Sequence, residues 1–438
     1  MTAATLTMTI LGATACTDSS SDDAADDTTE GDASTSPAPS GPFAAISTLS
    51  FGPDKVLFVA DSTAATITAV DVSGLSDASD NERHFNVYGA NSLIATALGV
   101  SESAMSVADV AVHPGDGSVF VAINYGAGDN AWATVARVTA DGAVMVVDDA
   151  TVATAPSIAL SNPISDDVSF WGRIPARSLS ITDIDHADGF LYVAGLSNAD
   201  FASTLYKVAY PFDGTQSLSS VEIYHAAHGQ NETRAPIRTQ TIIEVDGEKY
   251  LLAAYTCTPL VAIPLADIGD GAHVVGKTIA ELGNGNVPKD IMHMSFTDLA
   301  TQEPREVVVL TNQHLATMMI DMADIAAAIA QPGLSEPAGT GTAGVPFTTI
   351  PMDNDLIHVK TQGESRLITA RRNLIGGGID LLSLHQGAWG RLTEVVGEYD
   401  FATYECPPGS EIIETMSRWI AGEEGIDLDS IVTGRTCD

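Results

Sequence analysis

Basic residues are scarce in this chain. Its 438 residues include 19 lysines and arginines against 57 aspartates and glutamates, which gives a formal net charge of -38. A negative charge of this size repels nucleic acids and anionic lipid head groups at long range, so we expect no nucleic-acid partner. The same acidity keeps a protein soluble in salty water, where screening is strong.

Several catalytic and cofactor signatures are missing as well. The sequence contains no nucleophile elbow, P-loop, G-x-G-x-x-G fingerprint or C-x-x-C-H haem attachment motif. We therefore expect no haem and no nucleotide, and we exclude the α/β-hydrolase class. Metal-assisted hydrolysis needs only an open coordination position, so the sequence leaves open whether the chain is an enzyme.

Long apolar runs are lacking too. Residues 1–16 (MTAATLTMTILGATAC) are too short to span a bilayer and lack the basic residues of a secretory signal. Their end, Ala13 to Cys16, nevertheless resembles a bacterial lipobox, in which the cysteine is lipidated. We therefore expect a lipoprotein-type signal segment, lipidation at Cys16 and export to the periplasm or cell surface. An ordinary disordered N-terminus is the alternative.

The next segment, residues 17–42, contains no aromatic and no basic residue. Such a segment cannot bury enough apolar surface to fold. It is typical of a disordered, acidic Ser/Thr/Asp linker between an anchor and a domain.

Only four cysteines occur in the chain. In an oxidising compartment, Cys406 and Cys437 are the favoured disulfide, because they flank a helical pattern at residues 410–424. We expect residues 406–438 to form a C-terminal helical extension. Cys257 is left over, most simply as a buried thiol.

One strand-turn-strand pattern recurs six times from Phe43 onward, with a period of about 60 residues. This regularity predicts an all-β β-propeller over residues 43–405, in which each copy forms part of a four-stranded blade. Six blades are expected, seven are the alternative, and the closing blade can combine strands from both ends. Two β-rich domains would not explain the even spacing. The copies are residues 49–61, 110–124, 182–195, 242–256, 292–312 and 357–373.

Two segments depart from the strand pattern. Residues 321–330 (DMADIAAAIA) predict a helix that decorates a blade. Residues 332–351 are rich in Gly, Pro and Thr and predict a long surface loop.

The repeat unit resembles those of NHL, SMP-30/gluconolactonase and related six-bladed propellers, and the lipobox-like start resembles that of exported propeller lipoproteins. The resemblance covers about residues 43–398. It implies that the first strand of each blade lines a central channel, with ligands held at one mouth. It also implies that lactonase-like members hold Ca²⁺ there.

Acidic residues recur at the start of the predicted first strands, each followed by a histidine. If the aspartates converge on a channel, a cation such as Ca²⁺ must neutralise them. The alternative is that they hydrogen-bond turn backbones and tie blades together. Residues three apart on a strand point to opposite faces, so the Asp and His of one blade should not share a ligand. The aspartates are Asp109, Asp183, Asp290 and Asp355, and the histidines are His113, His186, His293 and His358.

A different metal signal combines His225 and His228 with Cys257. Imidazoles and a thiolate suit a borderline or soft metal such as Cu or Zn. The H-x-x-H spacing lacks the glutamate of the H-E-x-x-H motif, so it does not indicate a zinc protease.

Arginines form near-copies, R-I-P-A-R and R-A-P-I-R, before two adjacent first strands. At a channel mouth they would bind a carboxylate or phosphate, whereas pairing with nearby aspartates is the alternative. The full set of predicted ligand-binding residues is Arg173, Arg177, Glu232, Arg234, Arg238, Asn284 and Asn286.

These patterns together favour an exported, monomeric propeller that acts as a binding or interaction module. Its partner would be a small anionic ligand or another envelope protein, and it would meet the membrane only through the lipid anchor. The alternatives are a Ca²⁺-dependent lactonase/esterase-like hydrolase and a periplasmic copper- or zinc-binding protein.

Overall fold

A computed structural model describes residues 40–75, 83–170, 172–256, 258–283, 287–298, 301–350, 356–373 and 378–389. Several predictions lie outside these ranges and stay predictions. They concern the lipidation site Cys16, almost all of the linker, the helix at 410–424, the Cys406–Cys437 disulfide, Cys257, Asn284, Asn286 and Asp355.

The described residues form an all-β propeller whose strands pair in six four-stranded units. We number these blades by the order of their first strands. Blade 1 contains β1 (Ile46–Phe51), β2 (Val56–Asp61), β3 (Thr66–Asp71) and β9 (Ser157–Ala159). Blade 2 contains β5 (Met105–Val112), β6 (Val119–Tyr125), β7 (Trp132–Val138) and β8 (Val144–Val146). Blade 3 contains β12 (Asp183–Ala187), β13 (Phe190–Leu196), β14 (Ser203–Ala209) and β15 (Gln216–His225).

The other three blades follow the same plan. Blade 4 contains β17 (Ile237–Val245), β18 (Glu248–Tyr255), β19 (Pro259–Pro264) and β20 (His273–Leu282). Blade 5 contains β21 (Pro288–Thr297), β22 (Pro304–Asn312), β23 (Thr317–Asp321) and β25 (Thr348–Ile350). Blade 6 contains β26 (Leu356–Gln362), β27 (Arg366–Arg372), β28 (Ile379–His385) and β4 (Asn86–Val87).

Blades 3 and 4 share one continuous sheet, because their outer strands β15 and β20 pair in parallel. Two short strands extend this sheet: β16 (Gln230–Glu232) pairs with β15, and β24 (Thr342–Gly344) pairs with β20. A separate small hairpin joins β10 (Ser169–Phe170) to β11 (Ile174–Pro175).

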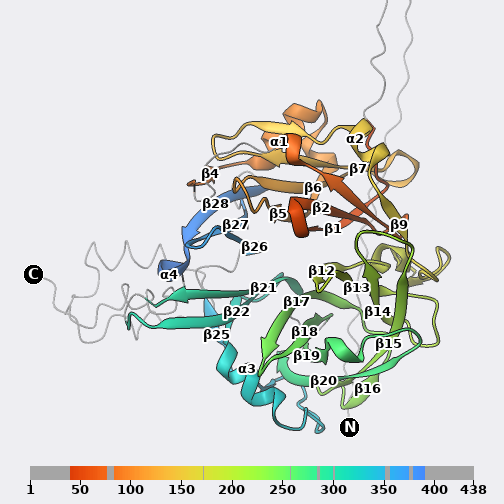
Figure 1. Ribbon diagram of the computed structural model, residues 1–438, viewed down its shortest axis with the longest axis vertical. Coiled ribbons are helices and arrows are strands. Elements are labelled where there is room, and N and C mark those ends of the chain that lie inside the picture. The colour runs from red at the N-terminus through yellow and green to blue at the C-terminus, as the bar shows by residue number, and fades with distance from the viewer. Residues whose placement is uncertain are drawn as a thin grey trace, which may run out of the picture. The chain divides into compact units, whose positions relative to one another are not determined.

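The blades do not follow chain order around the axis. The first strands surround a common centre, where β1 lies between β5 and β12, and β26 lies between β5 and β21 (Figure 1). The order around the ring is therefore blade 2, 1, 3, 4, 5, 6. To achieve this, the chain leaves blade 1 after β3, completes blade 6 with β4, builds blade 2, and returns to complete blade 1 with β9. These crossings bind three blades to one another.

The predicted strand-turn-strand copies are confirmed, since they coincide with the first two strands of the six blades. The closing blade does combine distant parts of the chain, β26 to β28 with β4. The prediction of a plain loop at 332–351 is wrong in part, because this segment supplies β24 and the outer strand β25. These strands are only three residues long and have Gly and Pro as neighbours, so they leave no alternating pattern to detect.

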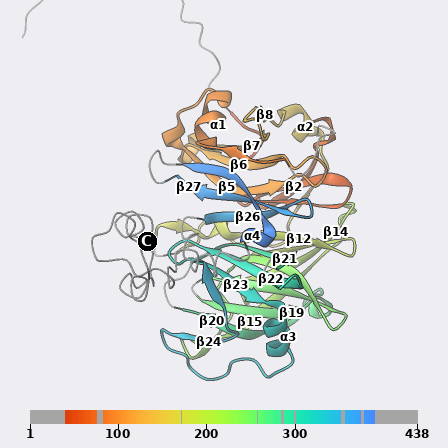
Figure 2. The same cartoon turned by 90° about the vertical axis from the view of Figure 1, so that its left-hand side faces the viewer.

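Helices are few and lie at the outside of the blades. The predicted helix is confirmed as α3 (Met322–Ile329), while α1 (Ala90–Leu98), α2 (Asp149–Thr154) and α4 (Gln386–Trp389) were not expected. Figure 2 shows α1 and α2 on the side opposite α3. In the described part of the chain, no helix is long and apolar enough to cross a membrane.

The core consists of the apolar layers between neighbouring blades. Strands such as β2 and β6 are buried almost throughout, because each sheet packs against a blade on both of its faces. This explains why second strands read as continuous apolar runs such as VFVAI rather than as alternating ones. The rigid packing of six sheets fixes the first strands around the channel.

Candidate site in the central channel

One residue from each blade projects toward the channel axis at the same level. In five of the six first strands, the pairing with the second strand shifts just before this residue, as it does at a β-bulge. The bulge turns the following side chain toward the neighbouring blades. We call the six residues the polar ring: Thr48, Asp109, Asp183, Thr239, Asp290 and His358.

The three ring aspartates tie blades together in pairs. Each accepts a hydrogen bond from the backbone N–H of the residue that follows it. Each also accepts one from the first strand of a neighbouring blade. These interblade bonds run from Leu49 to Asp109 (2.8 Å), from Gln240 to Asp183 (2.8 Å) and from Val359 to Asp290 (3.0 Å). The threonines add to this, since the Thr48 hydroxyl donates to Asp109 at 2.9 Å and the Thr239 hydroxyl donates to Asp183 at 2.8 Å.

Blade 6 has a histidine, His358, at its ring position, where blades 2, 3 and 5 have an aspartate. The bulge lies between Leu356 and His358 and turns His358 inward. The predicted Asp355 lies outside the described residues. The Nδ1 atom of His358 lies 3.3 Å from Asp109 Oδ1 and 3.7 Å from Asp290 Oδ2. His358 thus closes the ring between blades 2 and 5.

In the described residues, His186 and His293 do not pair with the aspartate of their own blade, as the strand period predicts. His293 pairs with Glu306 at 2.7 Å, and His186 stacks on Phe58. His113 is fully buried and its Nδ1 lies 3.1 Å from Asp116.

Lys360 supplies a positive charge to the ring. Its ammonium donates a hydrogen bond of 2.7 Å to Asp290. Burial lowers the pKa of Lys360, but the nearby carboxylates of Asp290, Asp109 and Asp183 outweigh it and raise that pKa above its usual range. The lysine is therefore charged at neutral pH. Sequence reasoning missed it, although a lysine two residues after His358 must lie on the same face of the strand.

Asp109, Asp290 and His358 have ligand atoms within 4.8 Å of one another, but their surroundings do not suit the Ca²⁺ ion that the family resemblance implies. Both carboxylate oxygens of Asp109 already accept hydrogen bonds, from Val110, Thr48 and Leu49. A hard cation needs several free oxygen ligands. Here the Lys360 ammonium lies among the same carboxylates and neutralises them, so we derive no hydrolytic step through a metal in this channel.

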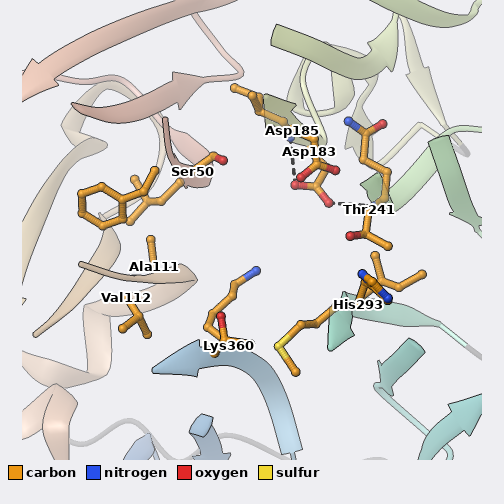
Figure 3. Close-up of a pocket in the computed structure, with 15 residues that line it drawn as sticks. Ser50, Ala111, Val112, Asp183, Asp185, Thr241, His293 and Lys360 are labelled. Atoms are coloured by element: carbon orange, nitrogen blue, oxygen red, sulfur yellow. Dashed lines mark hydrogen bonds between the residues drawn. The ribbon is translucent and has the colours of Figure 1, made fainter. Parts of the chain in front are cut away.

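A cavity of about 220 Å³ opens on one side of the ring. Figure 3 shows Lys360 extending into it, with Asp183 and Asp185 on the far wall and Ser50, Thr241 and His293 around them. Burial raises the pKa of Asp183 to about 6, although Lys360 opposes this. Burial and the charge of Asp183 raise the pKa of Asp185 well above its usual range, and one buried oxygen of Asp185 makes no hydrogen bond in the described residues.

A smaller cavity of about 70 Å³ opens on the other side of the ring, lined by the ring residues themselves, by residues that precede them on their strands, and by Lys360. Two of them, Arg238 and Lys289, are basic and make no ion pair with any described carboxylate within 4.0 Å. Burial lowers the pKa of Lys289, and the charges of Arg238 and Arg372 lower it further. We call Arg238 and Lys289 the basic mouth.

Arg238 is the member of the predicted arginine group that lines this channel. Its Nε atom is buried and makes no hydrogen bond in the described residues, and burial lowers its pKa. Arg177 instead donates to the carbonyls of Thr63 (3.0 Å) and Ile164 (2.8 Å). Arg173 and Arg234 are exposed and do not line either channel cavity. The two similar arginine motifs, R-I-P-A-R and R-A-P-I-R, therefore lie in different environments.

The sequence matches no protein-family model and no curated protein. Among solved structures, it is similar to the PQQ-bound form of aldose sugar dehydrogenase from Streptomyces coelicolor, with 12% identity over 79% of this chain and 96% of that chain, and a TM-score of 0.29. YCF48 from Cyanidioschyzon merolae gives 11% identity, coverages of 80% and 97%, and a TM-score of 0.33. Virginiamycin B lyase from Staphylococcus aureus gives 10% identity over 77% of this chain and 84% of that chain, with a TM-score of 0.28. The propeller assignment rests on the strand pairing, and these similarities say nothing about activity.

Proposed function

We propose that this propeller is a binding module that holds a small anionic ligand, a carboxylate or a phosphate, at its basic mouth. The observation that carries the proposal is the pair Arg238 and Lys289, two half-buried cations without a described carboxylate partner in a chain of net charge -38. Asp109, Asp183 and Asp290 line the same cavity, but each already accepts hydrogen bonds from a neighbouring blade.

An anion bound at the basic mouth would stabilise the charged side chains of both Arg238 and Lys289. It would accept a hydrogen bond from the buried Nε of Arg238, which is costly to leave unpaired. It would also offset the repulsion among Lys289, Arg238 and Arg372 that lowers the pKa of Lys289. Charge-assisted hydrogen bonds to arginine and lysine are strong contacts for carboxylates and phosphates. The cavity of about 70 Å³ suits a small anionic group rather than a large ligand.

The proposal rests on the mouth and not on membership of the NHL or gluconolactonase-like group. The exchanged positions of blades 1 and 2 depart from a simple sequential repeat. A binding role therefore follows from local chemistry alone.

Calorimetric titration of the full chain with inorganic phosphate, and separately with succinate, tests the proposal. Lys289→Met and Arg238→Gln should each weaken binding of at least one probe by roughly tenfold to a hundredfold, since a hydrogen bond to a charged group contributes about 1.5–3 kcal/mol. Lys249→Met is the matched control, because Lys249 is exposed and already pairs with Asp188. The proposal is overturned if the wild type binds neither phosphate nor succinate. It is also overturned if all three variants bind them equally well.

We also propose that the chain is exported and anchored through Cys16, on the evidence of its lipobox-like sequence. Expression in a bacterial host, followed by separation of membrane and soluble fractions, tests this. The wild type should partition with membranes and the Cys16→Ser variant should not. Membrane partitioning that persists in the variant would contradict a lipid anchor at this residue.

A further inference from the structure

A tight turn at the outer edge of blade 3 brings two histidines together. Strand β15 ends at His225, and the chain returns through β16. Within the turn, the N–H groups of His228 and Gly229 donate to the carbonyl of His225 at 3.1 and 2.8 Å. Gly229 has a φ of +66°, which favours glycine there. The imidazole rings of His225 and His228 consequently lie 3.9 Å apart between centroids.

Glu232 on β16 faces both imidazoles. Its Oε1 atom lies 2.6 Å from Nδ1 of His228, and its Oε2 atom lies 3.0 Å from Nδ1 of His225. One ligand atom from each of the three residues lies within 4.8 Å of the others. Such spacing is compatible with one shared ion at Zn–N and Zn–O distances of about 2.0–2.2 Å.

The Nδ1 atom of His225 is a buried polar atom without a hydrogen bond. The residue is 1% exposed, and its Nδ1 has no hydrogen-bond partner among the described residues, although it lies 3.0 Å from Oε2 of Glu232. Buried polar atoms in proteins nearly always have a partner, and a bound ion is one kind of partner. The Nδ1 atom of His228, by contrast, forms a hydrogen bond of 2.6 Å with Oε1 of Glu232.

The surroundings also suit metal binding. The other ring nitrogen of His225, Nε2, lies 3.0 Å from the hydroxyl of Thr258, a buried residue of blade 4. A ligating histidine is usually held by a hydrogen bond of this kind through its second nitrogen.

We propose that His225, His228 and Glu232 form a site for one Zn²⁺ ion at the edge of blade 3. Two imidazoles and a carboxylate are ligands of zinc sites that keep a fourth position for water or substrate. His228 is half-exposed, so the site is reachable from solvent. Hard cations prefer all-oxygen ligand sets and should bind weakly. The third ligand is thus Glu232, which the sequence-based prediction had assigned to ligand binding, while Cys257 lies outside the described residues.

The test is Zn²⁺ titration of the full chain after removal of bound metal with a chelator. The wild type should bind one equivalent that survives dialysis, and Co²⁺ at the same site should give the visible absorption of a low-coordinate ion. Glu232→Gln and His228→Ala should lower the affinity at least tenfold. His273→Ala is the matched control, since His273 forms an exposed His–Glu pair with Glu222 at 2.9 Å but has no second histidine in its described contacts.

Circular dichroism of each variant verifies that it is folded. Glu232→Gln is the more informative change, because it keeps the shape of the side chain and removes its charge. The proposal is overturned if the wild type retains no zinc, or if the Glu232 and His228 variants bind it like the control. Lys289→Met should bind zinc normally, so failure of the anion site and failure of this site are distinguishable.

Discussion

Lys360 of blade 6 donates a hydrogen bond to Asp290 of blade 5, with 2.7 Å between Nζ and Oδ1. The pair lies in the channel, where Asp109 and Asp183 are also close enough to raise the pKa of the lysine. A propeller that brings three aspartates to its axis must neutralise part of their charge. In this chain, a side chain from the last blade does so.

Replacing Lys360 should therefore destabilise the fold strongly. Lys360→Met leaves Asp290 without its charged partner in a buried ring, a change that typically costs about 3–5 kcal/mol. Urea unfolding of the wild type and variant measures the loss, and Lys360→Arg, which keeps the charge, should recover part of it. As a control, Lys249→Met, which removes the surface ion pair with Asp188, should change the free energy of unfolding by less than about 1 kcal/mol. Similar small effects for both lysines would show that Lys360 does not hold the ring together.

Asp185 should make stability fall as the pH rises. Its pKa in the folded state lies well above the value of about 3.9 expected in the unfolded chain, so the folded state keeps its proton longer. Wild-type stability should then decrease from about pH 4 up to the raised pKa, by at most about 1.4 kcal/mol per pH unit from this group.

Asp185→Asn should reduce this slope, because the neutral amide has no charge to bury, while Asp183, whose pKa is also raised, still contributes to it. The variant should be about as stable as the wild type near pH 4.5. At pH 8 it should be more stable, with a larger free energy of unfolding than the wild type. The exposed turn residue Asp246→Asn serves as control and should show no such trend. An advantage that is equal at both pH values would argue against a buried, proton-retaining Asp185.

A second buried charge cluster stabilises blade 2. The side chain of Arg137 is 2% exposed and its Nη2 lies 2.9 Å from Asp116 Oδ2. Burial raises the pKa of Asp116, but His113 and Ser118 outweigh it and lower that pKa well below its usual range. Arg137→Leu should cost about 3–5 kcal/mol by leaving a buried carboxylate short of its cation.

Adding Asp116→Asn to that variant should recover part of the loss, because no uncompensated charge then remains. Urea unfolding of the two single variants and the double variant gives the coupling energy of the pair, which should exceed about 1 kcal/mol. Additive losses would mean that the two residues stabilise blade 2 independently.

The repeating hairpins were predictable because each copy carries its own turn and its own apolar strand. The order of blades 1 and 2 was not, since the strands that decide it, β4 and β9, contain two and three residues. Strands this short are too short to show an alternating pattern of apolar residues. Their partner strands are also far away in the sequence, by nearly the whole chain for β4 and by a full blade for β9. Helix α1 was missed for a related reason, as nothing in its sequence begins or ends it except glycines at positions 89 and 99.

The channel shows a similar division. Asp109, Asp183 and Asp290 could be placed on the axis from their positions in the repeat. The bulge that brings His358 inward depends on pairing with a second strand, which the sequence of one strand does not reveal. Lys360 was visible in the sequence, but its role follows only from the charges that the other blades bring near it.

The pKa of Lys289 is the most direct test of the proposed anion site. It is measurable by NMR titration of the full chain labelled with ¹³C at the lysine ε-carbons, with Lys289→Met to assign the signal. Without added anion, the pKa should lie below the usual lysine value of about 10.4, because burial, Arg238 and Arg372 disfavour the charged form. Saturating phosphate or succinate should raise it. A pKa that neither anion changes would contradict the proposal that Lys289 and Arg238 hold an anionic ligand.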